Sequence, residues 1–260
     1  MADRPCRTHT KVPGAPDYDE PKFWDTRFAT GQDVGEWLNS GETLIDAVLS
    51  DLENRPGFEH DTPRVLHLGP GVSKLGLKLR DACVDRDWTG NGIVNVDFSA
   101  EAVRLGQNAE GQKAPNEAMH WVQVDLLSWN SVSALSSFAP FDVILDKSTS
   151  DAIATSSDRK FLSTENTSRL CPILQECLRE QPAIALSPVE LLALHLVPLT
   201  QKDTTWITLS YSTLRFDTVP AIKDYWTLRS RTALKAPPGP VSASAHTPEV
   251  YHWVYILDRK

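Results

Sequence analysis

A regular alternation of short apolar runs and helical patterns between residues 64 and 146 most constrains the fold of this chain. Apolar runs occupy residues 64–68, 92–97, 119–125 and 141–146, and consecutive runs begin 22 to 28 residues apart. Between the first three runs, apolar residues recur at helical spacing. Buried strands that alternate with helices are typical of βαβ units, so the sequence predicts a parallel sheet.

The C-terminal part changes this pattern. A fifth strand is predicted at residues 206–211, and two more at 225–234 and 250–257 are joined by a segment without a helical pattern. Two strands joined in this way pair antiparallel. The sequence therefore predicts an α/β, Rossmann-like sheet of seven mostly parallel strands, with an antiparallel C-terminal strand and helices on both faces.

The chain is predicted to be one domain with an N-terminal arm. Residues 1–20 are polar and rich in Pro and Asp, which is typical of a flexible terminus. Residues 21–260 contain no obvious linker and form the predicted domain. Within it, residues 148–203 exceed the usual length between two core strands and carry helical patterns, as binding loops and lids often do.

Composition narrows the classes of partner. The formal net charge is −8, which disfavours binding to nucleic acid or to an anionic membrane. No apolar stretch approaches the roughly 20 residues that span a bilayer, and the N-terminus lacks the apolar region of a secretory signal. The four cysteines show no zinc spacing, so we expect reduced thiols, a cytoplasmic location and no metal.

Polar residues follow three successive predicted strands. Gly69 and Gly71 form a turn after the first, and Asp97 and Asp125 end the next two. Nucleotide-like ligands bind at this edge of open α/β sheets, where a carboxylate accepts ribose hydroxyls. Each aspartate alone is equally consistent with an exposed strand end, but the three together indicate a nucleoside ligand. Lys74 stands where the dinucleotide fingerprint needs its third glycine, which disfavours a dehydrogenase.

Several segments resemble the class I S-adenosylmethionine (SAM) methyltransferases. More narrowly, they are similar to the methyltransferase-like enzymes that modify lysines of elongation factor 1-alpha, and the resemblance covers residues 20–260. Phe28, Pro70, Val72, Ser148 and Ser150 depart from that family's usual residues. The segments that carry the resemblance are KFWDTRF at 22–28, LGPGVS at 68–73, NVDFS at 95–99, VDL at 124–126, FDVILDKSTSD at 141–151 and YHWVYIL at 251–257.

The resemblance implies SAM as cofactor, S-adenosylhomocysteine (SAH) as product and no metal. We add Arg27 as a partner for the methionine carboxylate, because a guanidinium binds a carboxylate in a fork. The alternative for the tryptophans is ordinary core packing. The cofactor-binding residues expected from the resemblance and from this argument are Trp24, Arg27, Phe28, Trp37, Gly69, Gly71, Ser73, Asp97, Phe98, Asp125, Leu126 and Lys147.

The implied reaction is methylation of a lysine amine on a protein such as a translation factor. Methylation of a small molecule and SAM binding without catalysis remain alternatives. Asp146 and Asp151 are candidates to orient the amine or take its proton, with helix or loop capping as the competing interpretation. The segment 148–203 is expected to shape the acceptor site, the alternative being a structural embellishment. His195 lies among leucines and is expected to be structural.

Overall fold

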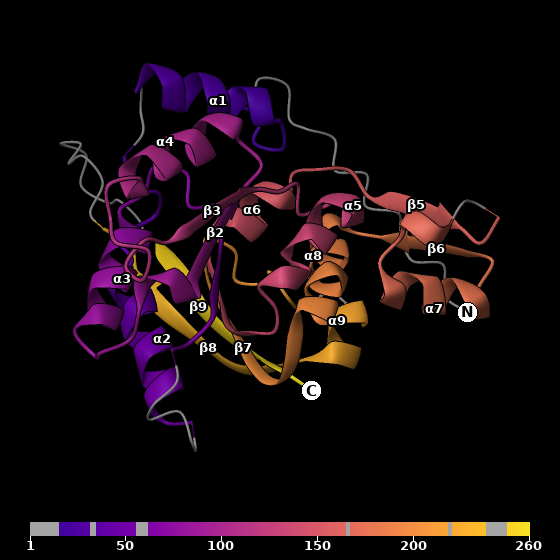
Figure 1. Cartoon of the computed structure of the whole chain (residues 1–260). Coiled ribbons are helices and arrows are strands. Elements are labelled where there is room, and N and C mark those ends of the chain that lie inside the picture. Colours follow the sequence, from indigo (N-terminus) through magenta and orange to yellow (C-terminus); the bar gives the residue numbers. More distant parts are fainter. Residues whose placement is uncertain (1–15, 32–34, 56–61, 165–166, 218–219, 238–248) are drawn as a thin grey trace, which may run out of the picture.

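The computed structural model describes residues 16–31, 35–55, 62–164, 167–217, 220–237 and 249–260. Seven strands form the main sheet, in the order β3-β2-β1-β4-β7-β9-β8 (Figure 1). Strands β3, β2, β1, β4 and β7 pair in parallel, while β9 runs antiparallel to both β7 and β8. The predicted fold class is therefore confirmed. The strands are β1 (Val65–Leu68), β2 (Ile93–Asp97), β3 (His120–Gln123), β4 (Phe141–Lys147), β7 (Thr200–Ser210), β8 (Trp226–Lys235) and β9 (Tyr251–Arg259).

Successive side chains of the central strands point to opposite faces of the sheet and belong to two separate hydrophobic cores. Leu66 and Ile144 belong to a cluster on the face that carries α8 and α9, whereas Val65 and Val143 pack with α2 and α3 on the other face. Because both faces are covered, β1 is buried along its whole length. The α-helices are α1 (Pro21–Thr30), α2 (Glu42–Glu53), α3 (Leu75–Val84), α4 (Ala100–Glu110), α5 (Trp129–Val132), α6 (Thr149–Ile153), α7 (Pro172–Glu180), α8 (Pro188–Leu196) and α9 (Pro220–Tyr225).

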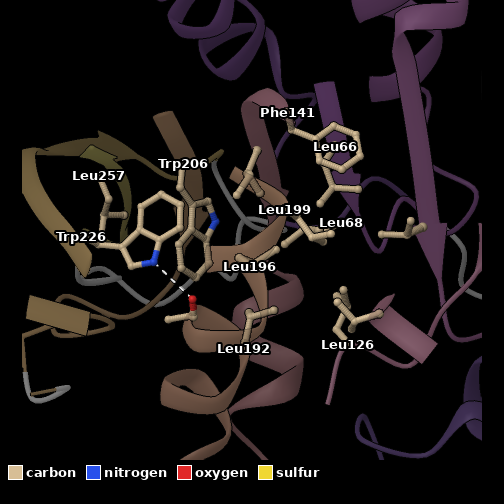
Figure 2. Close-up of a cluster of buried hydrophobic side chains, with 14 of the residues drawn as sticks. Leu66, Leu68, Leu126, Phe141, Leu192, Leu196, Leu199, Trp206, Trp226 and Leu257 are labelled. Atoms are coloured by element: carbon tan, nitrogen blue, oxygen red, sulfur yellow. Dashed lines mark hydrogen bonds between the residues drawn. The ribbon is translucent and has the colours of Figure 1, made fainter. Parts of the chain in front are cut away.

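Helix α8 is the centre of the larger core. It begins with a capping box, in which Ser187 Oγ accepts a bond from the Glu190 amide and the Glu190 carboxylate accepts one from the Ser187 amide. Its leucines pack beneath Trp206, and the indole of Trp226 donates a hydrogen bond to the Ala193 carbonyl oxygen at 3.2 Å (Figure 2). The far strands of the sheet are thereby fixed to the helix layer.

The segment after β4 contains an element that the sequence did not predict. Strands β5 (Arg159–Leu162) and β6 (Ala183–Leu186) form a separate two-stranded antiparallel sheet beside α7. In a third core cluster, Leu174 and Leu178 of α7 pack with Leu191 and Leu194 of α8. The lobe formed by β5, α7 and β6 thus covers the side of α8 that the main sheet leaves bare.

Replacing Leu192 tests the role of α8. Leu192 is fully buried in the larger core, so Leu192→Ala should lower the free energy of unfolding by about 2–5 kcal/mol. The matched control is Leu214→Ala at a leucine that is 56% exposed, which should change it by less than about 0.5 kcal/mol. Urea denaturation measures both, and equal losses would contradict this packing.

Candidate functional site

A cavity of about 1080 Å³ lies at the edge of the sheet where β1, β2, β3 and β4 end. This volume lies slightly above the usual range for sites that hold small molecules. The cavity walls come from the N-terminal segment, the turns after these four strands, α6 and the start of β5. All twelve residues that the sequence proposed for cofactor binding line this one cavity.

The turn after β1 requires its glycines. Gly69 and Gly71 have φ angles of 52° and 54°, in the left-handed region that side chains disfavour. A side chain at Gly69 would overlap Thr149 of α6, and one at Gly71 would meet the Phe28 ring of α1. The turn therefore lets two helices and a ligand approach the same backbone.

Asp97 ends β2 as a buried carboxylate beside this turn. Its Oδ2 accepts a hydrogen bond from the Gly71 amide and its Oδ1 one from the Ser99 amide, both at 2.9 Å. Burial raises the pKa of Asp97 to about 6, although the two amides oppose this shift. An ionised carboxylate accepts about four hydrogen bonds, so Asp97 retains capacity for ligand hydroxyls.

Asp125 and Leu126 form the next part of the wall, after β3. Asp125 is exposed, and its Oδ1 accepts a bond from the Leu127 amide at 2.9 Å. Behind this turn, His195 Nδ1 lies 2.8 Å from the Leu126 carbonyl oxygen. Burial lowers the pKa of His195 to about 4, so the ring is neutral at pH 7 and Nδ1 must carry the proton that it donates. His195 is thus a structural residue that positions the turn.

Aromatic rings of the N-terminal segment form the opposite wall. The Trp24 indole donates to the Tyr18 carbonyl oxygen at 2.9 Å and stacks on Phe28, with ring centroids 5.7 Å apart. Trp37 meets Trp24 edge-on at 6.0 Å, and Arg27 lines the same wall. Tyr18 therefore belongs to the cavity, although the sequence assigned it to a flexible arm. Residues 1–15 of that arm lie outside the described residues.

Glu36 joins this segment to the sheet, a role that the sequence analysis missed. Its Oε1 accepts a bond from the Lys74 amide at 2.8 Å, and its Oε2 accepts from Ser73 Oγ at 2.7 Å and from Lys147 Nζ at 2.5 Å. Burial raises the pKa of Glu36, but these donors outweigh it and hold the pKa below its ordinary value. Lys147 lines the cavity, as the sequence proposed, with its charge balanced by Glu36.

Asp25 makes the second attachment of the segment. Its Oδ1 accepts bonds from Ser99 Oγ at 2.5 Å and from the Glu101 amide at 3.2 Å, at the N-terminus of α4. Ser99 also accepts a bond from the Ala102 amide and is the N-cap of α4. A carboxylate is favoured at a helix N-terminus, and α1 accordingly lies against α4 (Figure 1).

The two candidate catalytic aspartates differ in position. Asp146 is fully buried and is absent from the cavity lining. Its Oδ1 accepts bonds from the Thr149 and Ser150 amides, which is the arrangement of a residue that caps α6. Asp151 lines the cavity, but it forms a buried ion pair with Arg215 at 2.6 Å. Catalysis by either carboxylate stays a prediction, and their bonds favour the capping interpretation.

Comparison with known proteins supports an enzymatic assignment. No model of a known protein family matches the chain. The chain is 28% identical over 249 residues to methyltransferase srdJ of Neurospora crassa. The aligned region covers 96% of this chain and 87% of srdJ.

Solved structures share the fold at low sequence identity. A SAM-dependent methyltransferase from Anabaena variabilis superposes with a TM-score of 0.53 at 11% identity, over 94% of this chain and 95% of that one. The N-methyltransferase NodS from Bradyrhizobium japonicum, solved with SAH, gives a TM-score of 0.50 at 10% identity, over 94% and 98%. The chain therefore has the fold of the SAM-dependent methyltransferases and is similar along nearly its whole length to a methyltransferase. None of these three proteins is named as a lysine methyltransferase of elongation factor 1-alpha, so that narrower resemblance stays a prediction.

Among the residues that the structure describes, no group of three or more His, Cys, Asp or Glu side chains is arranged to hold a metal ion. No helix among those residues has the length and apolar character needed to cross a membrane.

Removal of the Glu36 carboxylate tests the attachment of the N-terminal segment. Glu36→Ala leaves the Lys147 ammonium, whose side chain is 5% exposed, without its carboxylate partner, which is costly for a buried charge. We expect the affinity for SAH, measured by calorimetry, to fall at least about tenfold, or about 1.4 kcal/mol. The control Glu53→Ala removes an exposed ion pair with Arg86 and should leave the affinity unchanged. Unchanged affinity in Glu36→Ala would exclude a role for this attachment in cofactor binding.

Proposed function

We propose that SAM binds in the cavity at the carboxyl edge of the sheet, held by the twelve residues that the sequence singled out. The sheet order β3-β2-β1-β4 supports this, because it sets Asp125, Asp97 and Gly69 at neighbouring strand ends. The chemistry of these groups fits the cofactor: carboxylates suit ribose hydroxyls and the adenine amino group, and Arg27 suits the methionine carboxylate. The glycine turn leaves room for close approach.

The proposed acceptor is an amine, and specifically a lysine side chain of a partner protein. When bound, SAM supplies an electrophilic methyl group on its sulfonium sulfur and leaves as SAH. The lysine ammonium must first lose a proton, and its ordinary pKa of about 10.4 opposes this at pH 7. Surroundings of low polarity favour the neutral amine, and the aromatic residues of the cavity provide such surroundings.

The charge around the cavity supports a basic acceptor. Asp19, Glu20 and Asp158 line it, and the whole chain carries a formal net charge of −8. A lysine-rich segment of a protein, such as that of a translation factor, is complementary to such a surface. The competing candidate is a small-molecule acceptor. The cavity volume of about 1080 Å³ favours it, because this volume exceeds what many small ligands need and so leaves space for an acceptor beside SAM.

Label transfer separates these two candidates. The protein is incubated with methyl-labelled SAM and a cell extract freed of small molecules, and in parallel with the restored small-molecule fraction. We expect label in protein, and lysine methylation in its hydrolysate. Label only in the small-molecule fraction would establish the alternative, and an absence of label in both would oppose catalysis on any acceptor of that extract.

The pH dependence of cofactor binding tests Asp97. The carboxylate has to be ionised to accept ribose hydroxyls, and its pKa in the free protein is about 6. At pH 5 roughly one molecule in eleven carries the charge, so SAH affinity should fall about tenfold between pH 7.5 and pH 5. Asp97→Asn should bind weakly at both pH values and lose this dependence. Calorimetry measures the four affinities, and equal wild-type affinities at both pH values would contradict the role of Asp97.

A further inference from the structure

The cavity extends beyond the residues proposed for SAM, toward the ends of β4 and β7. Ser148, Asp151 and Tyr211 line this part, and Trp37, one of the twelve residues proposed for SAM, borders it from the N-terminal segment. The ligand positions after β1, β2 and β3 lie on the other side of β4 in the sheet order, so this end remains for the acceptor. The inference below concerns these residues and rests on the proposed amine acceptor.

Both carboxylate oxygens of Asp151 are occupied by hydrogen bonds and an ion pair from within the protein. Its Oδ2 accepts hydrogen bonds from Ser148 Oγ at 2.7 Å and from the Tyr211 amide at 3.1 Å. Its Oδ1 accepts from Ser210 Oγ at 2.5 Å and pairs with the Arg215 guanidinium at 2.6 Å. The side chain is 3% exposed. The carboxylate oxygens of Asp151 already accept hydrogen bonds from the protein, and Arg215 balances their charge. Asp151 is therefore poorly placed to take a proton from the amine that is methylated.

Two aromatic residues from distant parts of the chain are attached to this carboxylate. The Trp37 indole donates to Ser148 Oγ at 3.1 Å, and Ser148 Oγ in turn donates to Asp151. Tyr211 is attached through its backbone amide, and the Arg215 guanidinium carbon lies 5.5 Å from the centre of its ring. Trp37 and Tyr211 stay 40% and 56% exposed. Large rings this exposed have surface available for a ligand.

Ser148 adopts a backbone conformation that serine disfavours. Its φ is 66°, in the left-handed region where glycine is the usual residue. Strain of this kind persists where the surroundings hold it, and it marks functional sites. At this position the serine hydroxyl connects Trp37 with Asp151, a bridge that glycine would not make.

We propose that Trp37 and Tyr211 are the two walls that receive the acceptor amine, and that Asp151 is a positioning residue that holds both walls. Aromatic faces attract an alkylammonium ion and also accommodate the neutral amine that must react. In this arrangement Asp151 acts through Ser148 and the Tyr211 amide and does not touch the amine.

The test uses Nα-acetyl-lysine methylamide as a probe, titrated by saturation-transfer NMR into the whole protein with and without SAH. The wild-type protein should bind the probe. Tyr211→Ala and Trp37→Ala should each weaken probe binding about fivefold, while Tyr211→Phe, which keeps the ring, should bind as the wild type does. The matched control Tyr251→Ala, at a tyrosine that is 40% exposed and absent from the cavity lining, should leave binding unchanged.

The positioning role is tested separately. Ser148→Ala removes the hydrogen bond to Trp37 but leaves the Asp151–Arg215 ion pair in place. It should therefore weaken binding of the probe as much as Trp37→Ala does. The double variant, which combines Ser148→Ala with Trp37→Ala, should bind the probe no more weakly than either single variant, because both changes remove the same wall. Additive losses would show that Ser148 contacts the probe itself and would overturn the positioning role.

The outcome is distinguishable from failure of the proposed function. SAH affinity of Tyr211→Ala, measured by calorimetry, should equal that of the wild type, which also shows that the variant is folded. Absence of probe binding to the wild type, or equal binding by Tyr211→Ala, overturns the aromatic walls even if label transfer to lysine occurs. Absence of SAH binding and of label transfer overturns the proposed function instead.

Discussion

Parallel pairing of β1 with both β2 and β4 is the constraint on which the site depends. The register places Leu68 beside Val96 on one side and beside Asp146 on the other. The turn that follows β1 is therefore fixed between the ends of two strands, and the Gly69 amide donates to the Val96 carbonyl oxygen at 2.8 Å. Asp97 and the start of α6 meet at this turn as a consequence.

Buried charged side chains lie around this cavity, and they are stabilised in two ways. Lys147 and Asp151 are neutralised by ion pairs with Glu36 and Arg215. Asp97 and Asp146 are stabilised mainly by backbone amides, and burial raises the pKa of each to about 6. A raised carboxyl pKa means that the folded state binds more protons than the unfolded state between about pH 4 and 6. In that window these two groups make stability fall as pH rises.

The sequence was sufficient for the elements whose pattern is local. The seven strands of the main sheet follow from short-range periodicity. The residues that line the cavity were singled out by motifs at strand ends and by the family resemblance. The lobe of β5 and β6 was missed because each strand has four residues and the two are separated by α7, so no alternation or tight turn marks them. Glu36 was missed because its partners Ser73 and Lys147 lie 37 and 111 residues away.

The same separations have a consequence for the order in which the molecule assembles. Trp37 and Glu36 are made early during synthesis, but Ser148 and Lys147 follow 111 residues later. Ordering a segment through such distant contacts carries the entropy cost of closing a long loop, which is repaid only after the distant partners are fixed. The main sheet does not include the N-terminal segment, so it can form first. The closed cavity is then the last feature to be completed, and a chain with a finished sheet can still have an open site.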